Sequence, residues 1–175
     1  MRMRKTRRGQ GSYNMIKKLA PWLLGCALFG IGAFHSWDRT PVEISGTVDR
    51  SDGDSFWIDN REIRLFGVDA FEAGQICEID GRRYDCGAAS IAALRDLTRQ
   101  GVTCTGTSYD RYDRLLAVCF AQGRDINAAM VEQGRALAYG RYSRDYVDEE
   151  RRAEAAKAGA WAGDFQAPWE YRAGQ

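Results

Sequence analysis

Five acidic and basic side chains, gathered in two short segments, supply the groups that phosphate chemistry requires. They are Asp54, Arg64, Asp69, Glu72 and Arg114. Paired carboxylates hold hard divalent cations such as calcium or magnesium, and guanidiniums bind phosphate oxygens through two parallel N–H bonds. A bound cation beside a third acid can activate water for attack. The set therefore indicates metal-assisted hydrolysis of a phosphodiester.

Composition excludes histidine-based chemistry. The single histidine, His35, lies at the end of a basic N-terminal segment. Ser-His-Asp and Cys-His nucleophile systems and histidine-based zinc sites are therefore excluded. General acid–base catalysis would therefore have to use carboxylates, tyrosines or water.

Each motif also has a purely structural interpretation. Asp52-Gly53-Asp54 is the kind of tripeptide that forms a turn, and residues 110–114 resemble a polar hairpin loop. Arg64 and Glu72 could form an ordinary surface ion pair, which contributes little to stability. Taken singly, none of these motifs would establish a function.

The order of the motifs along the chain favours a functional site. Adjacent strands would return Asp69 to the end of the sheet where Asp54 lies, and converging carboxylates repel unless a cation separates them. Arg64 stands among the apolar residues Ile63, Leu65 and Phe66, which is an unusual place for a charge. A regular strand would point Arg64 and Asp69 to opposite faces, so we expect the chain to bend or end near Gly67.

Short strands followed by helices are predicted to position these residues. Runs rich in β-branched or aromatic residues predict five strands, at 42–49, 55–59, 61–68, 102–108 and 114–121. Helical spacing and capping residues predict three helices, at 87–99, from Asp125 to Gly134 and from Ser143 to about Gly159. The aromatic segment 161–171 is expected to pack back on the domain. We therefore predict a mainly β, α+β domain over residues 42–172, built on a small barrel.

The N-terminal segment differs sharply in charge from the rest of the chain. Residues 1–40 hold eight Lys or Arg and one acid, a net +7, whereas residues 41–175 hold seventeen basic and twenty-three acidic residues, a net −6. The uncharged apolar run 19–34 follows the basic residues, as in secretory signals. We predict a leader over residues 1–38, either a cleaved signal peptide or an uncleaved membrane anchor, and export of the domain. The negative domain charge excludes attraction of its whole surface to nucleic acid.

Four cysteines follow the leader, an even number that suits an oxidising compartment. Cys104 and Cys119 lie symmetrically about the 110–113 turn, where opposed strand positions bring β-carbons within disulfide distance. We predict that bridge, and by elimination a second between Cys77 and Cys86. The alternative, a thiolate metal site, lacks a histidine at ligand spacing.

Residues 48–72 and 110–118 resemble, in order and spacing, the two signatures of the staphylococcal nuclease-like (thermonuclease) family, and the similarity extends over about residues 42–161. The resemblance implies an OB-type five-stranded barrel with three helices. It also implies a calcium-dependent nuclease that acts on DNA and RNA and leaves 3′-phosphate ends.

The residue roles implied by this resemblance fall into three groups. The family's calcium ligands match Asp54, Asp69 and the backbone carbonyl of Ala70. Its catalytic residues match Arg64, Glu72 and Arg114. Residues that contact nucleotide phosphates match Arg111, Tyr112 and Tyr142.

Four positions depart from the family pattern. Ser55 replaces threonine and keeps the hydroxyl, and Ala70 lacks a larger side chain where the backbone oxygen is the expected ligand. Phe71 replaces a proline that would restrain φ beside Glu72. Asp113 replaces a glycine or glutamine beside Arg114, and its carboxylate could pair with that arginine and weaken phosphate binding.

We interpret the chain as an exported, calcium-dependent phosphodiesterase with nucleic acid as substrate and no protein partner. Residues 19–34 would anchor it to the membrane if the leader stays uncleaved. Two alternatives remain: a catalytically weak OB-fold module that binds nucleic acid or another envelope partner, and an envelope protein that uses the barrel as a scaffold.

Overall fold

The computed structural model describes residues 40–141 and 143–175. The expected leader, the apolar run 19–34 and Tyr142 lie outside these residues. Among the helices of the described part, none has the length and apolar character needed to cross a bilayer.

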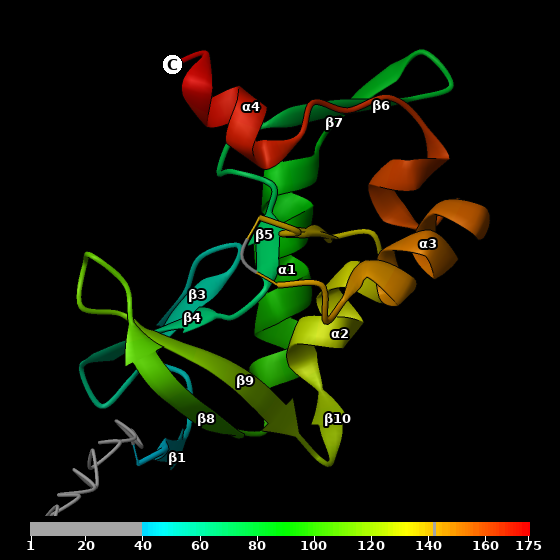
Figure 1. The fold of residues 1–175 in the computed structure, drawn as a ribbon. Coiled ribbons are helices and arrows are strands. Elements are labelled where there is room, and N and C mark those ends of the chain that lie inside the picture. The colour runs from blue at the N-terminus through cyan, green and yellow to red at the C-terminus, as the bar shows by residue number, and fades with distance from the viewer. Residues whose placement is uncertain (1–39, 142) are drawn as a thin grey trace, which may run out of the picture. The chain divides into compact units, whose positions relative to one another are not determined.

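One curled sheet carries most of the strands of the described part (Figure 1). Along its path the spatial order is β1 (Val42–Gly46), β8 (Val102–Tyr109), β9 (Leu115–Ala121), β4 (Arg61–Leu65), β3 (Ser55–Ile58) and β2 (Arg50–Ser51). A short strand β10 (Arg124–Asp125) pairs with β9. The β4–β9 pair is parallel and the other pairs are antiparallel. The five predicted strands correspond to β1, β3, β4, β8 and β9.

The predicted strand 61–68 is divided near Gly67, as expected. Strand β4 ends at Leu65, and a separate strand β5 (Val68–Ala70) pairs with β11 (Ala136–Ala138) instead of the main sheet. Gly67 takes a φ of +74°, a left-handed value that costs glycine little. The change of direction turns Asp69 back toward the end of β4.

Two helices begin at aspartate caps and lie against the sheet. Asp85 accepts a hydrogen bond from the N–H of Ala88 and opens α1 (Cys86–Thr98). Asp125 accepts one from Ala128 and opens α2 (Ile126–Glu132), which confirms the predicted cap. The main core lies between these helices and the sheet and includes the buried side chains of Phe56, Ile63, Leu94, Leu115 and Met130.

The C-terminal helices differ from the sequence prediction. The third helix, α3 (Val147–Ala155), begins at Val147 and not at Ser143, because the Ser143 hydroxyl accepts the N–H of Asp145 and forms a local turn. A 3₁₀ turn η1 (Gly159–Ala162) and a further helix α4 (Pro168–Ala173) follow. Helix α4 was not predicted, although Pro168 stands at its start, a favourable position for proline.

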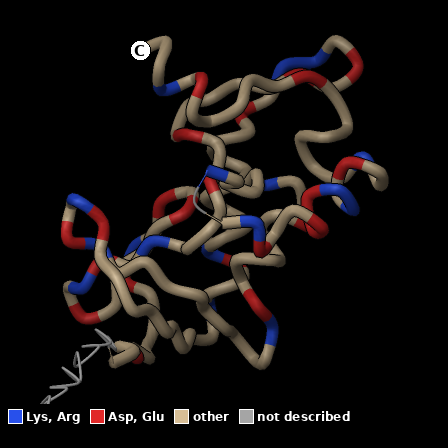
Figure 2. The backbone as a smooth tube through the Cα atoms, in the orientation of Figure 1, with Lys and Arg blue, Asp and Glu red and all other residues tan. Residues whose placement is uncertain are grey.

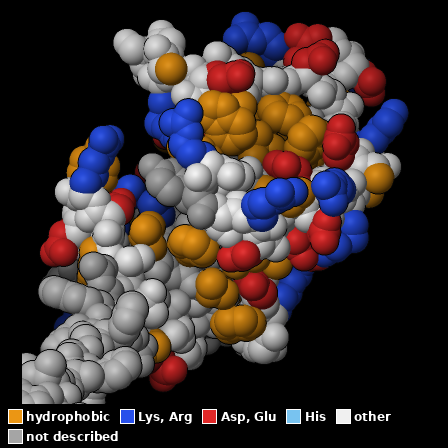
Figure 3. Space-filling view, viewed as in Figure 1, with side chains coloured by type: hydrophobic (Ala, Val, Ile, Leu, Met, Phe, Trp, Pro, Cys, Tyr) orange, Lys and Arg blue, Asp and Glu red, His pale blue; other side chains and the backbone are white. Residues whose placement is uncertain are grey.

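The aromatic tail packs on the domain, as predicted. A second cluster of buried side chains contains Phe71, Cys77, Cys86, Leu137 and Ala160. Trp161, Phe165 and Trp169 pack against it from the C-terminal segment. Figure 3 shows hydrophobic side chains gathered beneath this segment. The second cluster therefore joins the end of the chain to the loop that follows β5.

Both predicted disulfides are present. Cys104 and Cys119 stand directly opposite each other on β8 and β9, with Cα atoms 4.0 Å apart. Cys77 and Cys86 have Cα atoms 5.6 Å apart and join β6 (Ile76–Ile79) to the first residue of α1. The segment between these two cysteines is a hairpin, because β6 pairs with β7 (Arg82–Asp85) through a turn in which Asp80 and Gly81 both have positive φ.

Candidate active site

The structure brings three of the predicted site residues into direct contact. Arg64, from β4, donates from one guanidinium nitrogen to Oδ1 of Asp54 (2.7 Å) and from the other to Oδ1 of Asp69 (3.1 Å). Asp54 lies in the turn before β3, and Asp69 lies in β5 with no exposed surface. The turn, the bend at Gly67 and the β3–β4 pairing therefore place the two carboxylates on either side of one guanidinium.

Burial dominates the electrostatics of Asp54. Loss of solvent raises the pKa of Asp54 to about 6, the Arg64 guanidinium opposes this rise, and the neighbouring Asp69 carboxylate adds to it. The N–H of Ala70 also points to Oδ2 of Asp54, at 3.4 Å. A buried carboxylate pair of this kind needs positive charge to remain ionised.

Glu72 belongs to a loop that buried contacts fix in place. Its N–H donates to the side-chain oxygen of the fully buried Gln75 (3.0 Å), and its carbonyl accepts the backbone N–H of Gln75 (2.8 Å). A Cβ on Gly87, in the first turn of α1, would lie 1.8 Å from that same carbonyl oxygen. Only glycine allows the helix to approach the loop this closely.

Phe71 restrains the backbone beside Glu72 by packing. Its buried ring meets the ring of Phe165 edge to face, with centroids 5.4 Å apart. The family's proline would act through φ alone, whereas Phe71 ties the loop to the C-terminal segment. The replacement noted in the sequence therefore exchanges one restraint for another.

A third arginine that the sequence analysis missed completes this cluster. Arg172, in α4, donates to Oδ1 and Oδ2 of Asp69 at 3.0 and 2.8 Å and also contacts Oε1 of Glu72. The bonds to Asp69 raise the pKa of Arg172 above its ordinary value. Arg172 lies 103 residues from Asp69 and outside both signatures. The one sequence signal near it was the aromatic segment 161–171, which was expected to pack on the domain.

Arg114 is held by the carboxylate of Asp110. Its Nε and one terminal nitrogen lie 2.7 and 2.6 Å from Oδ2 of Asp110, and Glu62 is 3.9 Å away. Asp113, whose carboxylate could have paired with Arg114, lies in the turn with a φ of +64°. A left-handed turn position explains why glycine suits this place in the family.

The register of the sheet places Arg114 on the same face as Arg64. Arg64 pairs with Leu116 across β4 and β9, and Arg114 lies two residues before Leu116. Because side chains two apart on a strand share a face, both guanidiniums project to one side of the sheet. Figure 2 shows acidic and basic positions close together in the β8–β9 loop and again near β5.

Asp110 organises the β8–β9 loop. Its Oδ1 accepts the N–H groups of Tyr112 (2.9 Å) and Arg114 (3.0 Å), while Oδ2 accepts the Arg114 side chain. Partial burial acts to raise the pKa of Asp110, but these hydrogen bonds hold it below its ordinary value. Asp110 was not named as a site residue because its role depends on local loop geometry.

Two of the predicted phosphate-contacting residues, Arg111 and Tyr112, lie on the exposed side of this loop. Arg111 donates to the Tyr112 hydroxyl (2.7 Å), and its guanidinium lies 4.7 Å from the centre of the Tyr112 ring. Tyr112 is 63% exposed. Tyr142 lies outside the described residues. The neighbouring Tyr139 stacks on Trp169 with ring centroids 5.7 Å apart.

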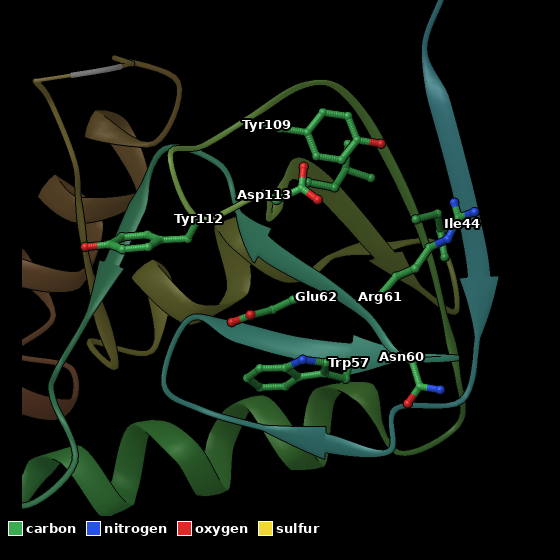
Figure 4. A pocket seen from close by; sticks show the side chains of 9 residues that line it. Ile44, Trp57, Asn60, Arg61, Glu62, Tyr109, Tyr112 and Asp113 are labelled. Carbon is green, nitrogen blue, oxygen red and sulfur yellow. The ribbon is translucent and has the colours of Figure 1, made fainter.

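An open pocket of about 450 Å³ adjoins the loop (Figure 4). Trp57, Tyr109 and Tyr112 contribute aromatic rings to its lining, and Glu62 contributes a carboxylate. Aromatic rings beside a polar wall are suited to stacking against a planar group.

The donor set fits a hard divalent cation, although guanidiniums now occupy it. In the described part of the chain no three Asp, Glu, His or Cys side chains converge as metal ligands. Instead, Arg64 forms ion pairs with Asp54 and Asp69, and Arg172 forms ion pairs with Asp69 and Glu72. Carboxylate oxygens of this kind are the ligands that calcium or magnesium prefers.

Comparison with known proteins decides the family. Residues 62–163 match the family described as "Staphylococcal nuclease homologue". The chain belongs to the staphylococcal nuclease-like family. Its curled sheet and helices are the OB-type α+β fold of that family, which confirms the predicted fold class, with α4 and η1 beyond the three helices expected.

Three relatives show how far this membership extends. The chain is 32% identical over 123 residues to the succinoglycan biosynthesis protein ExoI of Rhizobium meliloti (strain 1021), a match covering 67% of this chain and 64% of that protein. It is 38% identical over 104 residues to an uncharacterized endonuclease of Haemophilus influenzae (strain ATCC 51907 / DSM 11121 / KW20 / Rd), covering 58% and 53%. It is 34% identical over 125 residues to the micrococcal nuclease of Shigella flexneri, covering 63% and 67%. The matches therefore span about half to two thirds of each relative.

Proposed function

We propose that this protein is a calcium-dependent nuclease that hydrolyses phosphodiester bonds of DNA or RNA. The observation that carries the proposal is the contact of Arg64 with both Asp54 and Asp69, with Glu72 joined to the same cluster through Arg172. Family membership and two relatives named as nucleases support the same chemistry.

Asp54, Asp69 and the backbone carbonyl of Ala70 would hold the calcium ion. When bound, calcium supplies Lewis-acid polarisation of a phosphate oxygen and a position for water. Asp69 is fully buried and Asp54 nearly so, so their oxygens are screened little from a cation at this place.

The reaction then uses the protein's own side chains. Glu72 orients the attacking water and takes its proton, so that the water oxygen bonds to phosphorus. The bond from phosphorus to the 5′ oxygen breaks in line, the leaving oxygen takes up a proton, and a 3′-phosphate remains. Arg64 and Arg114, on one face of the sheet, neutralise the charge that develops on the phosphate.

Contacts to the neighbouring nucleotide fall to the exposed loop. Arg111 and Tyr112 would bind an adjacent phosphate, and the rings of Trp57 and Tyr109 would stack on an unpaired base. Because residues 41–175 carry a net −6, binding must rest on these local contacts and on the cation.

Export of the domain belongs to the same proposal. Two disulfides suit an extracytoplasmic compartment, since cytosolic thiols are kept reduced. The basic segment and the apolar run 19–34 would serve as a signal peptide or a membrane anchor. Fractionation of cells that produce the full chain tests this: recovery in the cytoplasm with free thiols would contradict export.

A binding module is the second candidate. The relative named for succinoglycan biosynthesis favours it, because OB folds also bind oligosaccharides without cutting them. In this case the carboxylates and arginines would hold a ligand and no product would form.

One assay separates the candidates. The full chain is incubated with single-stranded DNA in calcium or in excess chelator, and the ends of the products are analysed. The nuclease proposal predicts calcium-dependent cleavage with 3′-phosphate ends, reduced roughly 10²- to 10⁴-fold in Glu72→Gln. Arg151→Gln, which changes an exposed arginine paired with Asp148, serves as the matched control. Binding without cleavage would support the module instead.

A further inference from the structure

Arg172 occupies the oxygens that a metal ion would need. It donates to both carboxylate oxygens of Asp69, and Arg64 uses Oδ1 of the same carboxylate. Asp69 has no exposed surface, so a cation can reach its oxygens only by taking the place of a guanidinium that contacts them. Calcium bonds to oxygen at roughly 2.3–2.6 Å, which would leave it only a few ångströms from the Arg172 nitrogens. Like charges at that separation repel strongly in a weakly solvated site.

We propose that Arg172 is the internal counter-ion of the metal-free site, and that calcium displaces it and releases α4 from Asp69 and Glu72. The inference rests on the proposed calcium nuclease and adds its regulation. Without the cation, Arg172 compensates the carboxylate charge and engages Glu72. When calcium takes Asp69, Glu72 becomes free to act on water.

Arg172 is better placed to leave than Arg64. The Arg64 side chain is 19% exposed and projects from β4, which is paired on both sides. The Arg172 side chain is 40% exposed and projects from a helix of six residues, too short to be stable without tertiary contacts. Displacing Arg172 together with α4 should therefore cost less free energy than displacing Arg64 from β4.

The chain before α4 is fastened independently of Arg172, so the displacement has a defined limit. The Gln75 side chain, which accepts the N–H of Glu72, donates to the carbonyl of Gln166 (2.7 Å). The adjacent Phe165 ring packs on Phe71. These contacts hold Phe165 and Gln166 against the loop after β5 that carries Glu72. Ala167, the residue before α4, is extended, and it is where the helix would pivot.

The direct test is calcium binding by the full chain, measured by titration calorimetry. Arg172→Gln should bind calcium at least about tenfold more tightly, since removing one competing charge contact of ~1.4 kcal/mol changes the dissociation constant tenfold. Arg172→Lys keeps the charge but loses the two-pronged contact with Asp69, so its affinity should be intermediate. Arg151→Gln should bind as the unchanged protein does.

Hydrogen exchange gives a second readout that needs no substitution. In the unchanged protein, amides of residues 168–173 should exchange faster with calcium than with chelator, while those of α1 should not. In chelator, Arg172→Gln should also melt at a lower temperature than the unchanged protein, and saturating calcium should narrow the difference.

The outcomes separate the inference from the function on which it rests. Equal calcium affinity of Arg172→Gln and the unchanged protein, or slower exchange of residues 168–173 with calcium, would overturn the inference alone. Loss of cleavage at unchanged calcium affinity would assign Arg172 to substrate contact and also overturn it. Failure of every variant to bind calcium would overturn both the inference and the calcium assignment.

Discussion

At the residue scale, the two carboxylate oxygens of Asp110 have different roles. Oδ1 closes the β8–β9 loop through two backbone N–H groups, and Oδ2 fixes the direction of Arg114. The asparagine side chain could keep the first role, because its oxygen accepts hydrogen bonds, but its NH₂ group cannot replace the second. The two functions of Asp110 can therefore be separated by a single substitution.

Asp110→Asn should lower the free energy of unfolding by about 1–2 kcal/mol at neutral pH, because a charge-assisted contact to Arg114 is lost. The pKa of Asp110 is lowered in the folded state, so its stabilisation is present above the unfolded value of about 3.9 and is lost as pH falls through the folded value. Urea unfolding of the variant and the unchanged protein at several pH values checks this. The control is Asp113→Asn, which should change stability little; a pH-independent difference for Asp110→Asn would contradict the assignment.

At the element scale, the loop after β5 is held from three directions. Gly87 lets α1 approach it, Phe71 packs it on Phe165, and Gln75 bonds to it and to Gln166. The position of Glu72 therefore depends on the first turn of a helix and on a distant segment of chain as much as on β5. Gln75 is a positioning residue, since it acts through Glu72.

Gln75→Ala should lower kcat for DNA cleavage by roughly tenfold or more, with KM nearly unchanged, because Glu72 loses its orientation while phosphate contacts remain. Stability should fall by about 1–3 kcal/mol, since buried hydrogen-bonding groups lose their partner. Single-turnover rates over a range of substrate concentrations separate the two parameters. Gln75→Glu, which keeps the acceptor for the Glu72 N–H, should recover part of the rate; equal losses in both variants would indicate a structural role only.

The sequence predicts the elements whose signals are local. Asp125 before an apolar helix, Gly67 at a bend and Cys104 opposite Cys119 each carry their signal within a few residues or a single hairpin. Arg172 and the β6–β7 hairpin could not be predicted in this way. Their places depend on packing between segments far apart in sequence, such as Phe71 on Phe165. The contact of Arg114 with Asp110 could not be predicted for a related reason, because a short loop does not reveal from its sequence which of its acids faces the arginine.

At the scale of the whole molecule, two disulfides join different parts of the described domain. Cys104–Cys119 crosses the β8–β9 hairpin inside the main core, and Cys77–Cys86 ties β6 to α1 within the second cluster. The second bridge therefore supports the elements on which the C-terminal segment packs. Loss of either bridge should affect more than its own hairpin.

Reduction of both bridges should lower the free energy of unfolding by several kcal/mol, since each closed loop of this size contributes about 2–3 kcal/mol. Cys77→Ser with Cys86→Ser should in addition raise susceptibility to proteolysis within residues 159–175, because the second cluster loses its support. Cys104→Ser with Cys119→Ser is the matched control and should leave that segment protected. Limited proteolysis followed by mass spectrometry distinguishes the two, and equal cleavage of residues 159–175 in both would contradict the assignment.

We propose that Asp54 and Asp69 form the calcium site of a nuclease. This proposal is tested most directly by the rate of single-stranded DNA cleavage over a calcium titration, with the full chain beside Asp54→Asn. We expect no cleavage in chelator and a calcium midpoint at least about tenfold higher for Asp54→Asn, because one charged ligand is lost. Cleavage that persists in chelator, or a midpoint that does not move, would contradict it.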